Sequence, residues 1–113
     1  MKRKKDARKK RSSEVLLLDE VFSIHRKKGN GIIRRQVWVN SVEEVTRYSL
    51  AYINHRLFHG DNGRVLGYDN AHGYHHKHYM GKVEPIAFIS FEKVEKKFQS
   101  EFEVLHAEAK KVK

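Results

Sequence analysis

A single apolar stripe near the end of the chain is the feature that most constrains the fold. The apolar side chains recur at spacings of three and four residues: Phe91, Val94, Phe98, Phe102, Leu105 and Ala109. This spacing places them on one face of an amphipathic α-helix. Ser90 is a good N-cap, and Glu92 lies in the first turn, where a negative charge suits the helix dipole. We therefore expect a C-terminal helix that packs its aromatic face onto a sheet.

The chain ahead of this helix consists of short apolar segments typical of strands. The clearest is residues 46–53, where Tyr48, Leu50 and Tyr52 alternate with polar or small residues. We predict strands over residues 13–24, 32–40, 46–53, 64–69 and 74–80, with an edge or closing segment after Pro85.

Turn residues between these segments favour local, antiparallel pairing. The Asn-Gly pairs at 30–31 and 62–63 supply the positive φ that tight turns need. Ser41 and Glu44 are predicted to be the capping pair of a short turn between two strands. The predicted fold class is therefore α+β: an antiparallel meander of about four to six strands, packed on one face by the C-terminal helix.

The positive charge is concentrated at the start of the chain. The formal net charge is +10, and residues 1–11 alone hold eight Lys/Arg and one Asp. Like charges repel and this segment has little to bury, so we predict a disordered basic tail over residues 1–12 and a single α+β domain over residues 13–113. Such a tail favours a polyanionic partner, nucleic acid first; the alternative is a solvated segment that only aids solubility.

Several classes of protein are disfavoured by features that the sequence lacks. There is no cysteine, which excludes disulfides and thiolate zinc sites and fits a reducing compartment. No apolar run approaches the ~20 residues of a membrane span, and the basic start is not followed by the apolar core of a signal peptide. We expect a cytoplasmic protein with no membrane partner.

The segment of residues 68–80, YDNAHGYHHKHYM, is the predicted functional site. Four of the eight histidines, His72, His75, His76 and His78, lie within seven residues of one another. If residues 74–80 are extended, His76 and His78 share one face with Tyr74. The two imidazoles then lie about 6–7 Å apart along that face. Asp69 and Asn70 have a plainer alternative role as turn formers ahead of Gly73.

Two neighbouring imidazoles fit the chemistry of metal-free RNA cleavage. That reaction needs a base for the 2′-hydroxyl proton, an acid for the leaving 5′-oxygen, and a cation beside the charged phosphorus centre. The predicted catalytic residues are His76 and His78, with Tyr68 and Asp69 in support. The predicted RNA-binding residues are Arg47, Arg64, Lys77 and Tyr74. The sequence does not assign acid and base to individual histidines.

Two alternatives need no acid–base pair. The first is a metal-dependent nuclease, in which a divalent metal is bound by His72, His76, His78 and Asp69. The preferred mechanism, in contrast, needs no cofactor. In the second, the protein only binds nucleic acid, through an exposed sheet surface with Trp38, Tyr48 and Tyr52 together with the basic tail.

The same residues carry a resemblance to a known family. The Tyr-Asp-Asn segment at 68–70, Gly73, the His-Lys-His triplet at 76–78, Glu84-Pro85 and Phe88 resemble the pattern of the TumE family of prokaryotic toxin–antitoxin toxins. The resemblance covers about residues 13–110. Tyr74-His75 stands where many members have Gly-Asp, and the basic tail is not a family feature.

The resemblance implies a small cytoplasmic toxin that acts on RNA as an endoribonuclease. It also implies a small DNA-binding antitoxin as the cognate partner. The sequence leaves the oligomeric state open, with a homodimer among the alternatives.

Overall fold

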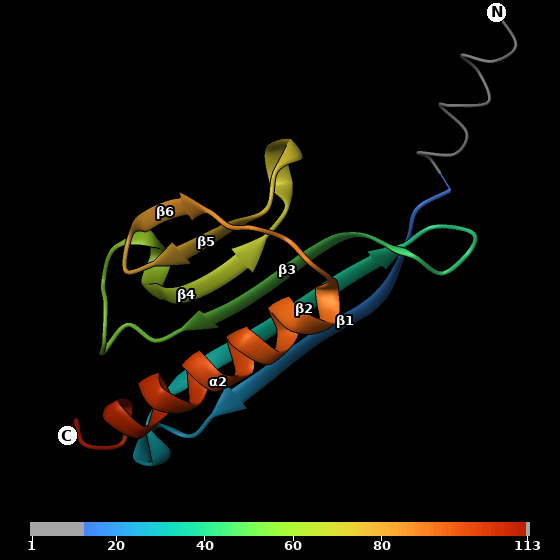
Figure 1. Ribbon diagram of the computed structural model, residues 1–113. Coiled ribbons are helices and arrows are strands. Elements are labelled where there is room, and N and C mark those ends of the chain that lie inside the picture. Colours follow the sequence, from blue (N-terminus) through green and yellow to red (C-terminus); the bar gives the residue numbers. More distant parts are fainter. Residues whose placement is uncertain (1–12, 113) are drawn as a thin grey trace, which may run out of the picture.

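The computed structural model describes residues 13–112 as a six-stranded antiparallel sheet with one α-helix on one face (Figure 1). The predicted basic tail and residue 113 lie outside the described residues. The strands follow the chain order as a meander, which confirms the predicted fold class. Among residues 13–112, no helix has the length and apolarity needed to cross a membrane.

The strands and helices have the following bounds. The strands are β1 (Val15–Ile24), β2 (Gly31–Val39), β3 (Val45–Ile53), β4 (Arg64–Asp69), β5 (His76–Tyr79) and β6 (Lys82–Pro85). The helix is α2 (Phe91–Ala109). Three short 3₁₀ turns complete the chain: η1 (Arg26–Lys28), η2 (Asp61–Gly63) and η3 (Ala71–Gly73).

The turns explain why pairing is local. Asn30 and Asn62 adopt positive φ values of 66° and 54°, as the Asn-Gly pairs predicted. The predicted capping pair of Ser41 and Glu44 is wrong, because the Asn40 side chain accepts hydrogen bonds from the backbone N–H groups of Val42 and Glu44, at 3.0 and 2.9 Å. Asn40 is the first residue after β2, and its short amide reaches the turn that follows.

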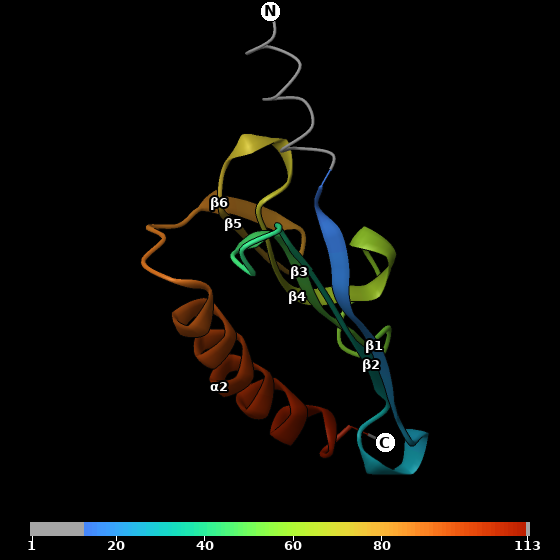
Figure 2. The same ribbon diagram turned by 90° about the vertical axis from the view of Figure 1, so that its right-hand side faces the viewer.

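The core lies between α2 and the middle strands of the sheet. Tyr48, Leu50 and Tyr52 of β3 and Tyr68 of β4 are at most 1% exposed. Phe102 meets Tyr52 edge to face, with ring centroids 4.9 Å apart. The predicted stripe and the Ser90 N-cap are confirmed, since Ser90 Oγ accepts from the Lys93 N–H at 3.2 Å. Figure 2 shows α2 on one side of the sheet; we call the opposite side the open face.

We expect burial of the apolar stripe of α2 to account for much of the stability of the fold. Phe98 is 2% exposed and its ring meets Tyr68 edge to face. We expect Phe98→Ala to lower the free energy of unfolding by about 3–5 kcal/mol, because it removes a buried ring and leaves a cavity. Val104, on the same helix, is 65% exposed and is the matched control. Val104→Ala should have little effect in urea unfolding, and equal losses from both variants would contradict this packing.

Candidate active site

Strand register brings Asp69, His76 and His78 together on the open face. Asp69 of β4 lies opposite His76 of β5, and Gly67 lies opposite His78. Lys77, between the two histidines, turns the other way and pairs with Glu101 of α2 at 2.7 Å. Alternation along β5 therefore points both imidazoles away from the helix. The prediction that His76 and His78 share a face is confirmed.

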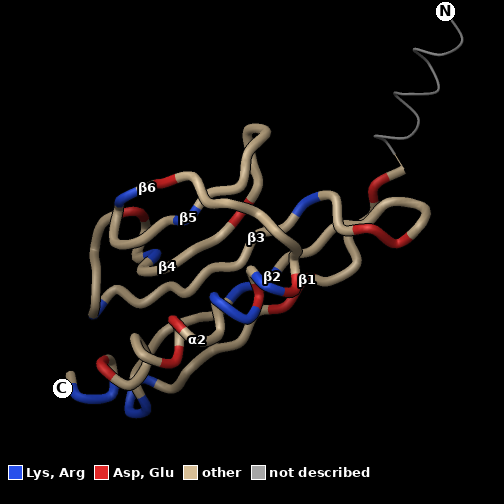
Figure 3. Tube along the Cα trace, viewed as in Figure 1, with Lys and Arg blue, Asp and Glu red and all other residues tan. Residues whose placement is uncertain are grey.

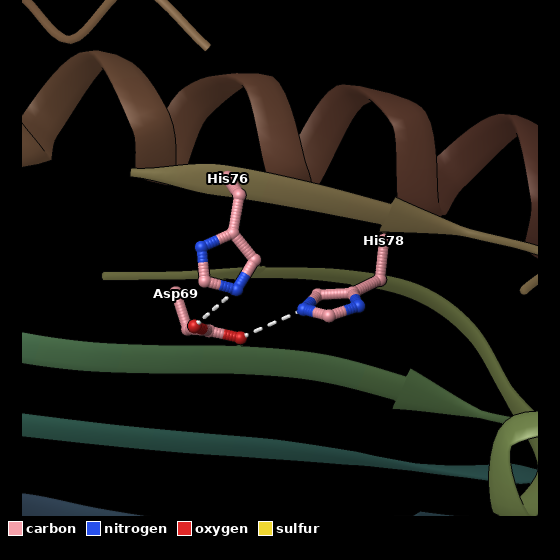
Figure 4. A group of neighbouring side chains, drawn as sticks. All are labelled: Asp69, His76 and His78. Atoms are coloured by element: carbon pink, nitrogen blue, oxygen red, sulfur yellow. Dashed lines mark hydrogen bonds and ion pairs between the residues drawn. The ribbon is translucent and has the colours of Figure 1, made fainter. Parts of the chain in front are cut away.

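The two imidazoles converge on one carboxylate, as Figure 4 shows. His76 Nε2 lies 2.8 Å from Asp69 Oδ1, and His78 Nε2 lies 3.0 Å from Asp69 Oδ2. The two rings are 4.8 Å apart between centroids, and the residues are only 4% and 9% exposed. The carboxylate of Asp69 also accepts from the backbone N–H of Ala71 at 3.0 Å.

Arg64 extends the cluster from the other side of His78. Its Nη2 lies 3.0 Å from His78 Nδ1, and Asp61 holds the guanidinium at two points, 2.8 and 3.1 Å. A Cβ on Gly67 would lie 2.9 Å from the Arg64 side chain, so glycine leaves the space that the arginine crosses. Asp61 was not predicted. The sequence feature that could have identified it is the spacing of Asp61 and Arg64 on either side of the Asn62-Gly63 turn.

The partners of His78 fix its proton on one nitrogen. A guanidinium can only donate, so Nδ1 accepts from Arg64. The proton of a neutral ring then sits on Nε2 and is donated to Asp69. Burial lowers the pKa of His78, and the positive charge of Arg64 lowers it further, against the opposing effect of Asp69. His78 is therefore held neutral, with its lone pair on Nδ1.

The partners of His76 differ from those of His78. Nδ1 lies 3.1 Å from the carbonyl oxygen of Tyr74, and Nε2 lies 2.8 Å from the Asp69 carboxylate. Both ring nitrogens of His76 therefore face oxygen acceptors, whereas Nδ1 of His78 faces a donor. One carboxylate thus contacts two imidazoles whose other neighbours differ.

The metal alternative keeps three of its four predicted ligands. Asp69, His76 and His78 offer ligand atoms within 4.8 Å of one another. His72 is exposed in η3, away from this group. The fit to a cation is poor, because Arg64 fixes the proton on the nitrogen of His78 that would have to bind the metal. A guanidinium beside the site also repels a divalent ion.

Two predicted site residues lie on the other face of the sheet. Tyr68 is adjacent to Asp69 in β4 and so points toward α2, where its hydroxyl donates to Glu101 at 2.5 Å. Lys77 binds the same glutamate. Strand alternation therefore separates Tyr68 and Lys77 from the histidine pair. His75 also belongs to that side, stacked on Phe88 at 3.7 Å between ring centroids.

The remaining predicted residues border the cluster on the open face. Arg47 of β3 is two residues from Ser49, which lies opposite Asp69. Its guanidinium lies 4.0 Å over the ring of Trp38 and pairs with Glu14 at 3.0 Å. The ring of Tyr74, which is 45% exposed, lies 4.6 Å from that of His76.

The exposed aromatic surface of the binding-only alternative is smaller than predicted. Tyr48 and Tyr52 are core residues under α2, because they occupy the strand positions that the helix stripe covers. Of the three aromatic residues predicted for that surface, only Trp38 is partly accessible.

The protonation states can be measured directly. In ¹⁵N-labelled protein at neutral pH, we expect the imidazole nitrogen shifts of a neutral Nε2–H ring for His78. Asp69→Asn keeps an oxygen acceptor and removes the anion that raises the pKa of His78, so this ring should stay neutral. Spectra of His72, exposed in η3, serve as the reference within the same sample. A charged His78 ring, or one protonated only on Nδ1, would contradict the assignment.

The comparison with protein families agrees with the sequence resemblance. A family model described as Toxin TumE matches residues 9–108, well over half of the 113 residues. Comparisons with curated proteins and with solved structures gave no match. The matched range includes every strand and nearly all of α2, and it contains the whole histidine cluster. The chain belongs to the TumE family of toxins.

Proposed function

We propose that this toxin cleaves RNA by metal-free acid–base catalysis at the cluster of Asp69, His76 and His78. The observation that supports it is the Asp69 carboxylate, which contacts both imidazoles beside Arg64. RNA cleavage needs one proton acceptor, one proton donor and one cation at the phosphate. This cluster contains one candidate for each.

In the proposed mechanism His78 is the base. Asp69 orients its ring through Nε2–H and leaves the lone pair of Nδ1 free for a proton, as a carboxylate does in a catalytic triad. Arg64 occupies the position beside Nδ1 in the free protein. When a phosphate engages the guanidinium, the 2′-hydroxyl takes this position and gives its proton to Nδ1. The 2′-oxygen then attacks phosphorus.

His76 is the acid in this scheme. As the bond between phosphorus and the 5′-oxygen breaks, the imidazolium gives a proton to the leaving oxygen, which yields a 2′,3′-cyclic phosphate and a 5′-hydroxyl. The ring is buried beneath Tyr74, so RNA has to displace that exposed side chain to reach it. Stacking of a base on Tyr74 offers a reason for the displacement. Arg47 and Trp38 would extend the contact along the open face.

The cellular setting of the proposal follows from the family. Membership supports an antitoxin as the partner, and we propose a small DNA-binding protein in this role. We place the reaction in the cytoplasm, where RNA is available, and assign the basic residues 1–12 to additional phosphate contacts. A protein that binds RNA in a salt-dependent way without cutting it is the competing function.

Single histidine substitutions test the catalytic roles. We expect His76→Ala and His78→Ala each to lower RNA cleavage by about 10²–10⁴-fold, the usual contribution of a positioned acid or base. Both variants should also relieve growth arrest on induction. His72→Ala, at an exposed position in η3, is the matched control and should behave like the parent chain.

Three outcomes would contradict the proposal. Full toxicity in both variants would remove the site assignment. Activity that is lost with a chelator and restored by a divalent metal would favour the metal-dependent alternative. Salt-sensitive RNA binding without new 5′-hydroxyl ends would favour the binding-only alternative.

The pH dependence tests the coupling between Arg64 and His78. The Arg64 charge lowers the pKa of His78, so Arg64→Gln should raise that pKa. A base must be deprotonated to act, so the acid limb of the kcat/KM profile should move to higher pH. Arg64→Lys keeps the charge but cannot make two parallel hydrogen bonds. The acid limb of its kcat/KM profile should stay near that of the parent chain, while kcat/KM itself falls. An unmoved limb in Arg64→Gln would contradict the role of His78 as the base.

A further inference from the structure

β1 is a long apolar strand at the edge of the sheet. It spans ten residues and, among the described strands, pairs only with β2. Five of its apolar side chains are 46–65% exposed: Val15, Leu16, Leu17, Val21 and Phe22. Its unpaired N–H and C=O groups therefore run beside apolar side chains on both faces. Such an edge is a template for pairing with another strand.

The opposite edge of the same sheet is protected in the usual ways. β6 has four residues, carries Lys82 and Glu84, and ends at Pro85, which has no N–H to donate (Figure 3). β1 has no proline and no lysine. Its only charges, Asp19 and Glu20, pair with Arg34 and Arg35 of β2. The contrast indicates that β1 is the edge that a second strand covers.

We propose that β1 pairs antiparallel with β1 of a second copy of this chain, on a two-fold axis at Val21. Antiparallel pairing continues the meander, and an isologous contact needs only one self-complementary strand. The basic tail of the same chain is a poor occupant, since Met1 and Ala7 are the only apolar residues among residues 1–12.

Charge narrows the choice of register. Residues opposite each other in an antiparallel pair share a face. An axis at Asp19 or Glu20 would place two like carboxylates opposite each other, which is unfavourable. Axes at Leu18, Val21 and Phe22 avoid this contact. Of these we choose Val21, because it places Asp19 opposite Ser23, whose hydroxyl can donate to the carboxylate.

The same axis pairs residues 18–24 of the two copies, and Val15, Leu16 and Leu17 extend beyond the paired segment. It sets Leu18 opposite Ile24 of the second copy, and Glu20 opposite Phe22, so no two acidic residues meet. Leu18, Glu20 and Phe22 share the helix side of β1, as their partners Val37, Arg35 and Ile33 on β2 show. The paired edges would form one twelve-stranded sheet. Its two open faces would be continuous, with Arg34 of each copy near the axis.

Cross-linking at the axis tests this arrangement in the full chain, which has no cysteine of its own. Val21→Cys should oxidise to a covalent dimer, because residues directly opposite have Cα atoms about 4.5–5.5 Å apart, within the range of a disulfide. Val83→Cys is the matched control, a valine that is 53% exposed on β6; it should remain largely uncross-linked. The unmodified chain should have twice its monomer mass of 13.4 kDa in light scattering, and Val21→Lys should be monomeric.

Each other outcome would overturn the proposal. These outcomes are a monomeric unmodified chain, equal cross-linking of both cysteine variants, or a dimer that Val21→Cys does not cross-link. If the unmodified chain is monomeric in the absence of the antitoxin, and Val21→Lys breaks its complex with the antitoxin, then β1 is the surface that binds the antitoxin instead. Circular dichroism of Val21→Lys distinguishes a lost interface from a lost fold. None of these results depends on RNA cleavage, so the dimer and the proposed function can fail separately.

Discussion

The apolar stripe of α2 packs against one face of the sheet, and the arrangement of the rest of the molecule depends on this packing. Phe98 and Phe102 meet the edges or faces of Tyr68 and Tyr52, so these strand positions are committed to the helix. Side chains alternate along a strand, so the residues between them must point to the open face. Asp69 follows Tyr68, and the position of the carboxylate is therefore a consequence of what the helix covers.

The histidine cluster shows how buried polar groups are held without an uncompensated charge. Burial of an ionised group is costly unless it is paired and hydrogen-bonded. Asp69 accepts three hydrogen bonds, and Asp61 neutralises Arg64 from outside the sheet. These contacts give each buried polar group a partner. The acid and base roles that we propose for two identical side chains rest on the difference between their neighbours.

The open face connects the two proposals. Moving across the sheet from β1, Arg34 and Trp38 lie on β2, Arg47 lies on β3, and the cluster lies on β4 and β5. Pairing through β1 would join two such surfaces edge to edge. Each candidate catalytic cluster would then lie several strands from the axis, roughly 4.8 Å per strand, at the far part of a common basic surface.

The sequence by itself determined the local features. The stripe from Phe91 to Ala109 predicted the helix, Asn-Gly pairs predicted the turns, and alternation predicted that His76 and His78 share a face. These features depend on neighbours in the chain. The sequence also named Asp69 and Arg64 but grouped Tyr68 and Lys77 with them, because spacing alone does not say which face of a sheet a helix covers.

Only the tertiary structure decided which of these side chains meet. The register of β4 and β5 placed Asp69 against both histidines, and the fold of η2 brought Asp61 to Arg64. The tautomer of a neutral His78 followed from those contacts, since the Arg64 guanidinium can only donate to Nδ1. Contacts between strands depend on register and on which face each side chain occupies, and a list of residues contains neither.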